Sequence, residues 1–249
     1  MPEPVSFDRV ADVYDATRGG AARGRRLAGD IRDLLLPGRT LEVGVGTGVV
    51  ALGLRELGCQ VAGVDIAPKM LARAYARLGG VVACGDASAL PIASSSVDNV
   101  VFVHVLHLVN DLRLAVSEAA RVLRPGGRMA AVHAAPEIVP DELSTVAAPA
   151  LPLRHRRPDT VDAVRSAGAG VNLRHITTRF SSPAIIDETP SGLAGKYQDR
   201  VFAWLWSVDG ATWQRVVAPM IAALRALPDP HRPRRQVIRT TITVLERLP

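Results

Sequence analysis

Glycines and carboxylates with a spacing suited to ligand binding occur in three short segments of the sequence. The stretch LEVGVGTGVV, residues 41–50, has glycine at every second position from 44 to 48 within an apolar run. Glycine weakens strands and helices, so this pattern indicates a tight turn whose backbone can approach a ligand closely. Asp65 in VAGVDIAPKML and Asp86 in VVACGDASALP each follow an apolar run. Carboxylates at strand ends can bind the hydroxyls of a ribose or accept a hydrogen bond from the amino group of adenine.

The residues in and after this glycine turn exclude two common phosphate-binding motifs. The dinucleotide fingerprint G-x-G-x-x-G needs a third glycine where this sequence has Val49, and no Gly-Lys-Ser/Thr follows as the phosphate loop requires. The turn also contains no arginine or lysine to pair with a pyrophosphate. These features predict a site for a nucleoside without phosphates. The alternative is structural, in which Asp65 or Asp86 caps the helix or turn that follows it.

The order of apolar runs and helical patterns after residue 38 predicts the elements that position these residues. Short, almost fully apolar runs alternate with helical patterns of ten or more residues. This alternation is typical of an α/β fold with a parallel sheet covered by helices on both faces, in the doubly wound, Rossmann-like arrangement. We predict strands near 40–45, 60–65, 81–85, 97–104 and 127–133, helices near 48–58, 68–79 and 111–123, and a short turn at 88–91.

Helices are predicted before this core, and a mixture of elements is predicted after it. FDRVADVYDATRG carries its apolar residues on one helical face, and a second helical pattern continues to Pro37. After residue 134 we expect a helix at 159–168, strands at 171–180 and 236–247, and helical stretches at 191–206 and 210–227. We predict one domain over residues 1–249, made of an N-terminal helical cap (1–38), a cofactor-binding core (39–133) and a helical substrate lid (184–230).

The composition favours a soluble cytoplasmic protein. The formal net charge of +6 over 249 residues is carried by 28 arginines and two lysines. No apolar run is long enough to cross a bilayer, and the first residues do not resemble a signal peptide. The arginine-rich clusters at 154–158 and 231–235 are interpreted as solvated loops, with a patch for an anionic partner as the alternative. Cys59 and Cys84 are predicted to be buried free thiols, and no metal site is expected.

Taken in order, five segments of the core resemble the class I S-adenosylmethionine-dependent methyltransferases, in particular the broad family of small-molecule enzymes of methyltransferase type 11/25. The segments are LEVGVGTGVVA, GVDIAPKML, GDASALP, VDNVVFVHVLHLV and EAARVLRPGGRM. They cover about residues 39–133, and FDRVADVYDATRG extends the resemblance towards the N-terminus. The resemblance implies a sheet of seven strands whose last strand, QVIRTTITVLER, is antiparallel. It also implies S-adenosyl-L-methionine as cofactor and S-adenosyl-L-homocysteine as product.

The same resemblance assigns parts of the cofactor to residues at the strand ends and in the N-terminal helix. The methionine part is expected against Glu42 and the backbone of Gly44, Val45 and Gly46, and the ribose against Asp65. The adenine is expected against Ile66, Met70, Asp86 and Ala87. The sulfonium is expected near Val103 and His104. Tyr14 and Arg18 would close the site from the N-terminal helix, where Arg18 could pair with the cofactor carboxylate. A core aromatic and a solvated helix end are the alternatives for these two residues.

The implied reaction is methyl transfer by in-line displacement at the sulfonium methyl group. The protein must align a nucleophile with the carbon–sulfur bond and exclude water. A hydroxyl, amine or thiol acceptor can also need a base, and His104, His107 and His133 lie at the predicted strand ends or just beyond them. We place His104 and His107 ahead of His133 as base or substrate contact. The alternatives are hydrogen-bonded structural histidines, and a reaction that depends on alignment alone.

Half of the aromatic residues gather in the predicted helical lid. They are Tyr197, Phe202, Trp204, Trp206 and Trp213. Tryptophan covers flat apolar ligands while its N–H remains available for a hydrogen bond. The cluster therefore predicts a lid over a small apolar or aromatic substrate, such as a secondary metabolite. The alternative is that these side chains only dock the lid helices on the core.

Three other functions share some of these features. An RNA or DNA methyltransferase fits the basic charge, but the fourth strand ends in FVHVLHL and lacks an Asn/Asp-Pro-Pro-Tyr type of motif, and no Pro-Cys pair offers a thiol that attacks cytosine. A relative could use the cofactor for cyclisation or rearrangement without methyl transfer. A non-catalytic binding protein would not need the glycine turn and both carboxylates. We predict a small-molecule enzyme, monomeric or homodimeric, that binds neither nucleic acid nor membrane.

Overall fold

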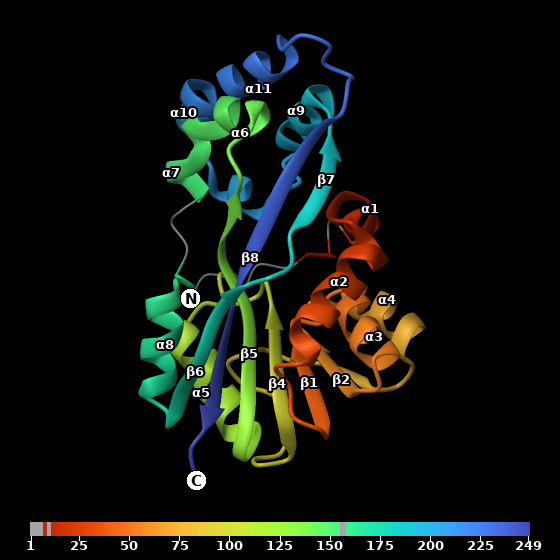
Figure 1. Cartoon of the computed structure of the whole chain (residues 1–249), viewed down its shortest axis with the longest axis vertical. Coiled ribbons are helices and arrows are strands. Elements are labelled where there is room, and N and C mark those ends of the chain that lie inside the picture. The colour runs from red at the N-terminus through yellow and green to blue at the C-terminus, as the bar shows by residue number, and fades with distance from the viewer. Residues whose placement is uncertain (1–6, 9–10, 155–157) are drawn as a thin grey trace. The chain divides into compact units, whose positions relative to one another are not determined.

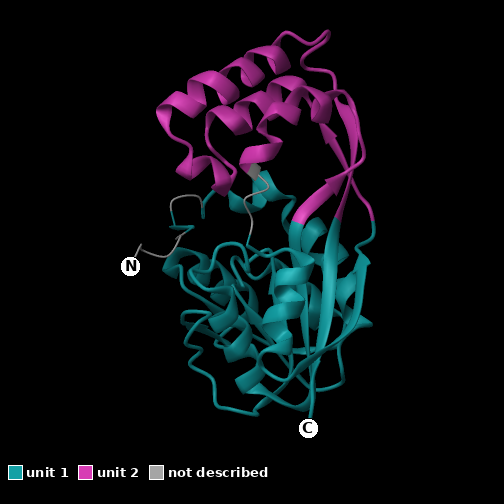
Figure 2. Cartoon of the chain, turned by 90° about the vertical axis from the view of Figure 1, so that its left-hand side faces the viewer, with its two compact units in different colours: residues 1–134, 158–182, 240–249 teal, residues 135–157, 183–239 magenta. Residues whose placement is uncertain are grey.

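The computed structural model describes residues 7–8, 11–154 and 158–249, and these form two compact units (Figure 2). Unit 1 consists of residues 1–134, 158–182 and 240–249, and unit 2 consists of residues 135–157 and 183–239. Val10, the first residues of the chain and most of the arginine cluster at 154–158 lie outside the described residues. None of the described helices is both long enough and apolar enough to span a bilayer.

A mixed sheet carries the fold, as the sequence predicts. Its strands are β1 Arg39–Val43, β2 Gln60–Asp65, β3 Val82–Cys84, β4 Val97–Val103, β5 Leu123–Ile138, β6 Leu173–Phe180, β7 Ala184–Glu188 and β8 Arg234–Arg247. The order is β3-β2-β1-β4-β5-β8-β6, and β7 pairs with β8. The strands from β3 to β5 pair in parallel, whereas β8 is antiparallel to β6 and β7. The doubly wound α/β fold with an antiparallel last strand is confirmed, but the described residues form eight strands instead of the expected seven.

Two differences from the predicted strands have local causes. Strand β7 was not predicted, because AIIDE is short, follows a proline and shows no alternation of buried and exposed residues. Strand β5 starts at Leu123, earlier than the strand predicted near 127–133, and its pairing with β4 shifts register where Gly126 takes a φ of 76°. Four residues of β5, 124–127, lie opposite a single residue of β4, so β5 bulges outward there, and glycine accommodates the left-handed backbone that this needs.

The helices of unit 1 cover both faces of the sheet (Figure 1). They are α1 Tyr14–Arg18, α2 Gly20–Arg32, α3 Val49–Glu56, α4 Pro68–Leu78, α5 Leu112–Val122 and α8 Val161–Ala169. Helices α2, α3 and α4 pack on one face against residues such as Val101 and Val103, and α5 and α8 pack on the other against Val100 and Phe102. Because successive strand residues point to opposite faces, the apolar run of β4 supplies both layers.

The N-terminal segment is less helical than predicted. Residues 11–13 form a turn and α1 starts only at Tyr14, so the helix predicted over FDRVADVYDATRG is one turn and a half long. It ends at Gly19, which adopts a left-handed φ of 82°, and Gly20 starts α2 instead of ending a helix. A left-handed glycine directly after a helix is a common C-terminal cap.

Unit 2 is helical apart from β7 and the ends of β5 and β8. Its helices are α6 Glu142–Ala147, the 3₁₀ turn η2 Ala148–Ala150, α7 Leu151–Arg154, α9 Pro190–Gln198, the 3₁₀ turn η3 Ala203–Ser207, α10 Gly210–Thr212, the π-helical η4 Trp213–Val217 and α11 Ala218–Arg225. The predicted helix 191–206 is therefore broken after Gln198. Helix α6 was missed among prolines, although Asp141 and Ser144 form a capping box at its start.

The cysteine prediction was half wrong. Both thiols are free, and Cys59 is partly buried before β2, which raises the pKa of its thiol. Cys84, however, is exposed. It lies on β3, a strand of three residues at the edge of the sheet, so that one side of the strand has no neighbour to cover it.

Asn99 joins the start of β1 to β4 at the end of the sheet opposite the glycine turn. It is fully buried in the strand interior, in register with Thr40. Its Nδ2 donates to the carbonyl of Leu36 at 2.9 Å and to Thr40 Oγ1 at 3.2 Å, and its Oδ1 accepts from the Leu36 N–H at 2.9 Å. These bonds fix the chain where it enters the first strand.

Replacing Asn99 by alanine should destabilise the protein by about 2–4 kcal/mol. The substitution leaves both backbone groups of Leu36 without this partner in a partly buried setting, where each unsatisfied group costs about 1–2 kcal/mol, the lower part of the range for buried groups. Urea unfolding followed by circular dichroism measures the change. Asn110→Ala is the control, because Asn110 is exposed in a loop. Equal midpoints for both variants would contradict this account of Asn99.

Candidate cofactor site

The glycine turn lies between β1 and α3, and its three glycines have different surroundings. Gly44, Gly46 and Gly48 all have positive φ, at 71°, 56° and 82°. A Cβ on Gly44 would lie 2.2 Å from Val105 Cγ2, and one on Gly48 would lie 3.1 Å from Ala74 Cα. A Cβ on Gly46 would meet nothing within 4 Å. Two glycines therefore make room for packing, whereas Gly46 borders open space.

Asp65 connects this turn to the end of β2. Its Oδ2 accepts a hydrogen bond from the Gly46 N–H at 2.7 Å, and its Oδ1 accepts one from the Ala67 N–H at 2.9 Å. Burial raises the pKa of Asp65, and these backbone N–H groups act in the opposite direction. The N-terminal cap of α4 is Ala67, with no side-chain bond from the cap residue. Asp65 thus organises both the turn and the approach to α4, and its predicted contact with a ribose remains a prediction.

Glu42 is the most unusual group of the site. It lies on β1 two residues before the turn, is only 2% exposed, and its Oε2 has no hydrogen-bond partner among the described residues. Burial raises its pKa to about 8. A hydrogen bond with the Ala51 backbone in the first turn of α3 and the charge of Arg23 lower this pKa, while the charge of Asp65 raises it further. A buried acceptor of this kind favours a cationic ligand group.

Asp86 follows β3 and, as the structural alternative predicts, forms the turn after it. Its Oδ1 accepts from the Ser88 N–H at 2.8 Å and from Ser88 Oγ at 2.6 Å, and its backbone forms an isolated bridge with Ala89. Ala87 lies in this turn and is partly buried. Oδ2 of Asp86 has no hydrogen bond to any residue that the structure describes, and its predicted contact with an adenine amino group remains a prediction.

Tyr14 and Met70 pack together beside the end of β2. Met70 is buried in a small cluster with Ala11 and Ala67, and Phe7 and Tyr14 cover it. The rings of Phe7 and Tyr14 meet edge to face at 5.9 Å. Ile66, between Asp65 and Ala67, is partly buried. Met70, which is predicted to contact the adenine, is therefore covered by Phe7 and Tyr14 of the N-terminal segment.

Arg18 is placed at the end of α1 with its guanidinium 5.9 Å from the centre of the Tyr14 ring. Burial lowers the pKa of Arg18, and the charge of Arg23 lowers it as well. The predicted alternative of a fully solvated helix end therefore does not describe this side chain. Its pairing with a cofactor carboxylate remains a prediction.

An acidic–basic ladder, missed in the sequence, joins the N-terminal segment to α4. Asp8 accepts from the backbone N–H of Lys69 at 2.8 Å, Asp12 pairs with Arg73 at 2.6 Å, and Asp15 pairs with Arg77. The three aspartates are spaced four and three residues apart, and the basic residues at 69, 73 and 77 are four apart. These helical spacings are the signal in the sequence that could have revealed the ladder.

The last rung of this ladder also reaches the glycine turn. Thr47 donates its hydroxyl to Asp15 Oδ1 at 2.6 Å, and its carbonyl accepts from Arg77. The turn, α1 and α4 are thus held by one hydrogen-bonded network.

The three candidate histidines differ in their surroundings. His104, directly after Val103 of β4, has a positive φ of 56° and donates its backbone N–H to the Val132 carbonyl at 2.8 Å. His107 Nδ1 lies 3.8 Å from a carboxylate oxygen of Asp159, a residue absent from the predicted site. His133 is fully buried and both its ring nitrogens are hydrogen-bonded, which is the structural role that the sequence left open for it.

The five aromatic residues of the predicted lid belong to the interior of unit 2. Tyr197 is buried, and Phe202, Trp204 and Trp213 pack against the same cluster. Phe202 and Trp204 stack, and Trp206 Nε1 donates to the Arg200 carbonyl at 2.7 Å. These contacts agree with the docking alternative, and contact with a substrate remains a prediction.

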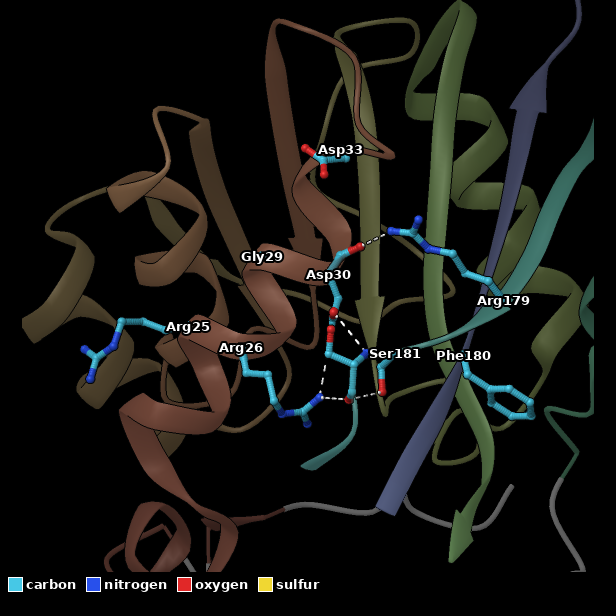
Figure 3. A pocket seen from close by; sticks show the side chains of 9 residues that line it. Arg25, Arg26, Gly29, Asp30, Asp33, Arg179, Phe180 and Ser181 are labelled. Carbon is cyan, nitrogen blue, oxygen red and sulfur yellow. Dashed lines mark hydrogen bonds and ion pairs between the residues drawn. The ribbon is translucent and has the colours of Figure 1, made fainter. Parts of the chain in front are cut away.

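A polar cavity of about 570 Å³ lies elsewhere on unit 1, between α2 and the end of β6 (Figure 3). None of the predicted site residues lines it. Asp30 organises it, because its side chain accepts from Arg26 and the Ser182 N–H, and its carbonyl accepts from Arg179. Arg25 and Phe180 point away from this cluster in Figure 3. The cavity is a structural junction between a helix and an edge strand.

Together, the parallel strands, the glycine turn and the carboxylates define an α/β domain with a site at the carboxyl ends of its strands. Residues 41–131 match the model of the methyltransferase domain family. A stretch of 104 residues is 43% identical to an uncharacterized methyltransferase of Mycobacterium tuberculosis, covering 40% of this chain and 42% of the relative. A demethylmenaquinone methyltransferase of Renibacterium salmoninarum is 35% identical over 136 residues, 51% of this chain and 57% of the relative.

A solved structure supports the fold over the whole length. Phosphoethanolamine N-methyltransferase 2 of Haemonchus contortus, in complex with S-adenosylhomocysteine, superposes with a TM-score of 0.56 at 17% identity, over 98% of this chain and 58% of that one. The match to the methyltransferase domain model over residues 41–131 agrees with the resemblance seen in the motifs. It spans about half the length of the curated relatives it matches.

Ionisation of Glu42 should make the folded protein less stable as the pH rises. The folded state holds this proton up to a pKa of about 8, whereas an unfolded carboxyl releases it near 4.5. The folded state therefore binds more protons between these values, and Glu42 contributes stability below pH 4.5 that is lost as the pH rises towards 8. The loss is at most about 1.4 kcal/mol per pH unit.

Glu42→Gln should flatten this decline in urea unfolding measured at several pH values from 5 to 8. Glu56→Gln serves as control, because Glu56 is exposed at the end of α3. A Glu42→Gln variant whose stability falls with pH as steeply as the wild type would show that Glu42 is ionised throughout.

Proposed function

We propose that this protein transfers a methyl group from S-adenosylmethionine to a small molecule. The observation that carries the proposal is the buried Glu42 carboxyl group, whose Oε2 has no hydrogen-bond partner among the described residues. Glu42 lies two positions before the glycine turn, which borders open space at Gly46. A ligand with an ammonium group would satisfy that oxygen. The open space beside Gly46 can hold part of a ligand, and a Cβ at this position would project into that space.

The chain's own residues divide the work of holding this cofactor. Glu42 would accept from its ammonium group, the turn at Gly46 would lie against its amino acid part, and Asp65 would accept from the ribose hydroxyls. Asp86 would accept from the adenine amino group through Oδ2. The bound cofactor would supply an electrophilic methyl group, and the protein would hold the acceptor in line with it and exclude water.

The acceptor is proposed to be apolar or aromatic. The support for this is the concentration of aromatic residues in unit 2, with Tyr197, Trp204 and Trp213 among them, because such side chains suit flat apolar ligands. The relative from Renibacterium salmoninarum is named for demethylmenaquinone, which agrees with an apolar acceptor. A secondary metabolite is one acceptor of this kind. Formation of S-adenosylhomocysteine during turnover distinguishes methyl transfer from a cyclisation or rearrangement that leaves the cofactor intact.

Gly46→Ala should abolish cofactor binding at little cost to the fold. The added methyl group would project into the open space where the ligand is placed, and the left-handed φ costs about 1–2 kcal/mol for an alanine. Isothermal titration with S-adenosylhomocysteine measures binding. Gly58→Ala is a matched control, because Gly58 has a φ of 83° and equally open surroundings but precedes β2 at the opposite end. Equal binding by the two variants would remove the turn from the cofactor site.

Asp65→Ala should weaken S-adenosylhomocysteine binding about ten- to a hundredfold. Hydrogen bonds to a charged group contribute about 1.5–3 kcal/mol, and the substitution removes the partner of the Gly46 N–H as well. Asp98→Ala is the control, because Asp98 also accepts a backbone N–H, that of Arg39 at 2.7 Å, but near the start of β4. Unchanged affinity in titrations of Asp65→Ala would exclude a ribose contact.

A further inference from the structure

A carboxylate–histidine pair lies beside the glycine turn. Val105, whose side chain fills the space over Gly44, begins a turn closed by the Leu108 N–H on the Val105 carbonyl at 2.7 Å. His107 is inside this turn, and its Nδ1 lies 3.8 Å from Oδ2 of Asp159. The Asp159 side chain is fully buried, while that of His107 is 21% exposed. The pair therefore has one enclosed acidic member and one member that a ligand can reach.

Asp159 is fixed from the neighbouring strand β5. The Ala134 N–H donates to Asp159 Oδ2 at 3.1 Å, and Ala134 adopts a left-handed φ of 61° that only rarely occurs in alanine. Thr160, the next residue, caps α8 by accepting from the Ala163 N–H. The carboxylate therefore lies immediately before the N-terminus of α8.

His133 holds the backbone of Asp159 in a defined way. Its Nδ1 lies 2.7 Å from the Asp159 carbonyl, which can only accept, so Nδ1 carries a proton. In the neutral ring Nε2 then accepts from Thr243 Oγ1, at 2.8 Å. Both His133 and Thr243 are fully buried. The aspartate is thus anchored through its carbonyl by a buried histidine and through its carboxylate by a strand N–H.

We propose that His107 is the base that accepts the proton of the methyl acceptor and that Asp159 is its positioning residue; this rests on the methyl-transfer function proposed above. With Nδ1 facing the carboxylate, Nε2 is the ring nitrogen directed away from it. Nε2 takes the proton of an acceptor O–H, S–H or ammonium N–H while the acceptor lone pair forms the bond to the methyl carbon. The electrons of the broken carbon–sulfur bond stay on sulfur. The positive charge lost by the sulfonium methyl donor appears on His107, where Asp159 balances it.

This assignment narrows the acceptor class. A base paired with a buried carboxylate serves an acceptor that must lose a proton as it is methylated, such as a phenol, a hydroquinone or a thiol. An acceptor that is already an uncharged tertiary amine would not need it. The proposed substrate is therefore an apolar molecule that carries an ionisable O–H, S–H or N–H.

Asp159→Asn tests the pairing without any ligand. The imidazole pKa of His107 is followed by proton–nitrogen NMR, with its signals assigned by their loss in His107→Gln. Among the described residues, Asp159 faces His107, His104 lies three residues earlier in the chain, and His133 on β5 binds the backbone of Asp159. Because a carboxylate within about 4–6 Å shifts such a pKa by about 1–3, it should fall by about one unit or more in Asp159→Asn. An unchanged value overturns the proposal.

Two further variants separate charge from packing. Asp159→Glu keeps the charge and should restore most of the His107 pKa, whereas Asp162→Asn, an exposed change in the first turn of α8, should leave it as in the wild type. Asparagine in place of Asp159 can still accept from the Ala134 N–H, and urea unfolding checks that the variant folds. A His107 pKa that falls equally in Asp162→Asn, or is not restored in Asp159→Glu, overturns the role of Asp159.

Turnover tests the base itself, with S-adenosylhomocysteine formed from a panel of phenols as readout. His107→Gln should lower kcat about 10²–10⁴-fold with phenols that are neutral at the assay pH, and much less with nitrophenols that are already ionised. Equal losses across the panel, or no loss, overturn the base. Failure of wild-type protein to bind S-adenosylhomocysteine would instead overturn the proposed function, whatever the pKa of His107.

Discussion

The desolvation of a carboxylate at the end of the first strand is the constraint on which the cofactor site depends. Glu42 and Asp65 lie at adjacent strand ends, and burial raises the pKa of both. Asp65 recovers part of the cost through N–H groups of Gly46 and Ala67, whereas Oε2 of Glu42 has no partner in the described structure. An unsatisfied buried acceptor costs free energy that a fold without a ligand does not recover. One carboxylate thus shapes the turn, and the other is suited to receive a cation.

The ladder between the N-terminal segment and α4 helps to hold the glycine turn in place, and its rungs contribute unequally to stability. The pair of Asp12 and Arg73 is largely exposed, and exposed pairs contribute little because solvent screens them. Asp15 is less exposed and bonds both Arg77 and Thr47. Attachment of this segment is therefore concentrated at its last rung. The same rung holds Thr47 next to Gly46, so Asp15 links the position of the N-terminal segment to the shape of the turn.

The sequence predicts those parts of the structure that have a local signal. The strands β1, β2 and β4 follow from short apolar runs, and Glu42 and Asp65 stand out as charges within or after such runs. Asp159 has no local signal, because its neighbours His107 and Ala134 come from distant parts of the chain and only sheet pairing brings them together. Strand β7 was lost for a similar reason, since its pairing with β8 rather than its own pattern makes it a strand.

The charges of the site also bear on which ligand it suits. The turn carries no arginine or lysine, while Glu42 on β1 precedes it and Asp65 at the end of β2 binds it, so the local field favours a cation over a phosphate. With a pKa of about 8, Glu42 is largely protonated at neutral pH in the absence of a ligand. An ammonium group beside it would lower that pKa and draw off the proton, because an opposite charge favours the ionised form. The burial that makes Glu42 costly alone therefore strengthens its interaction with a bound cation, since the low dielectric acts on both.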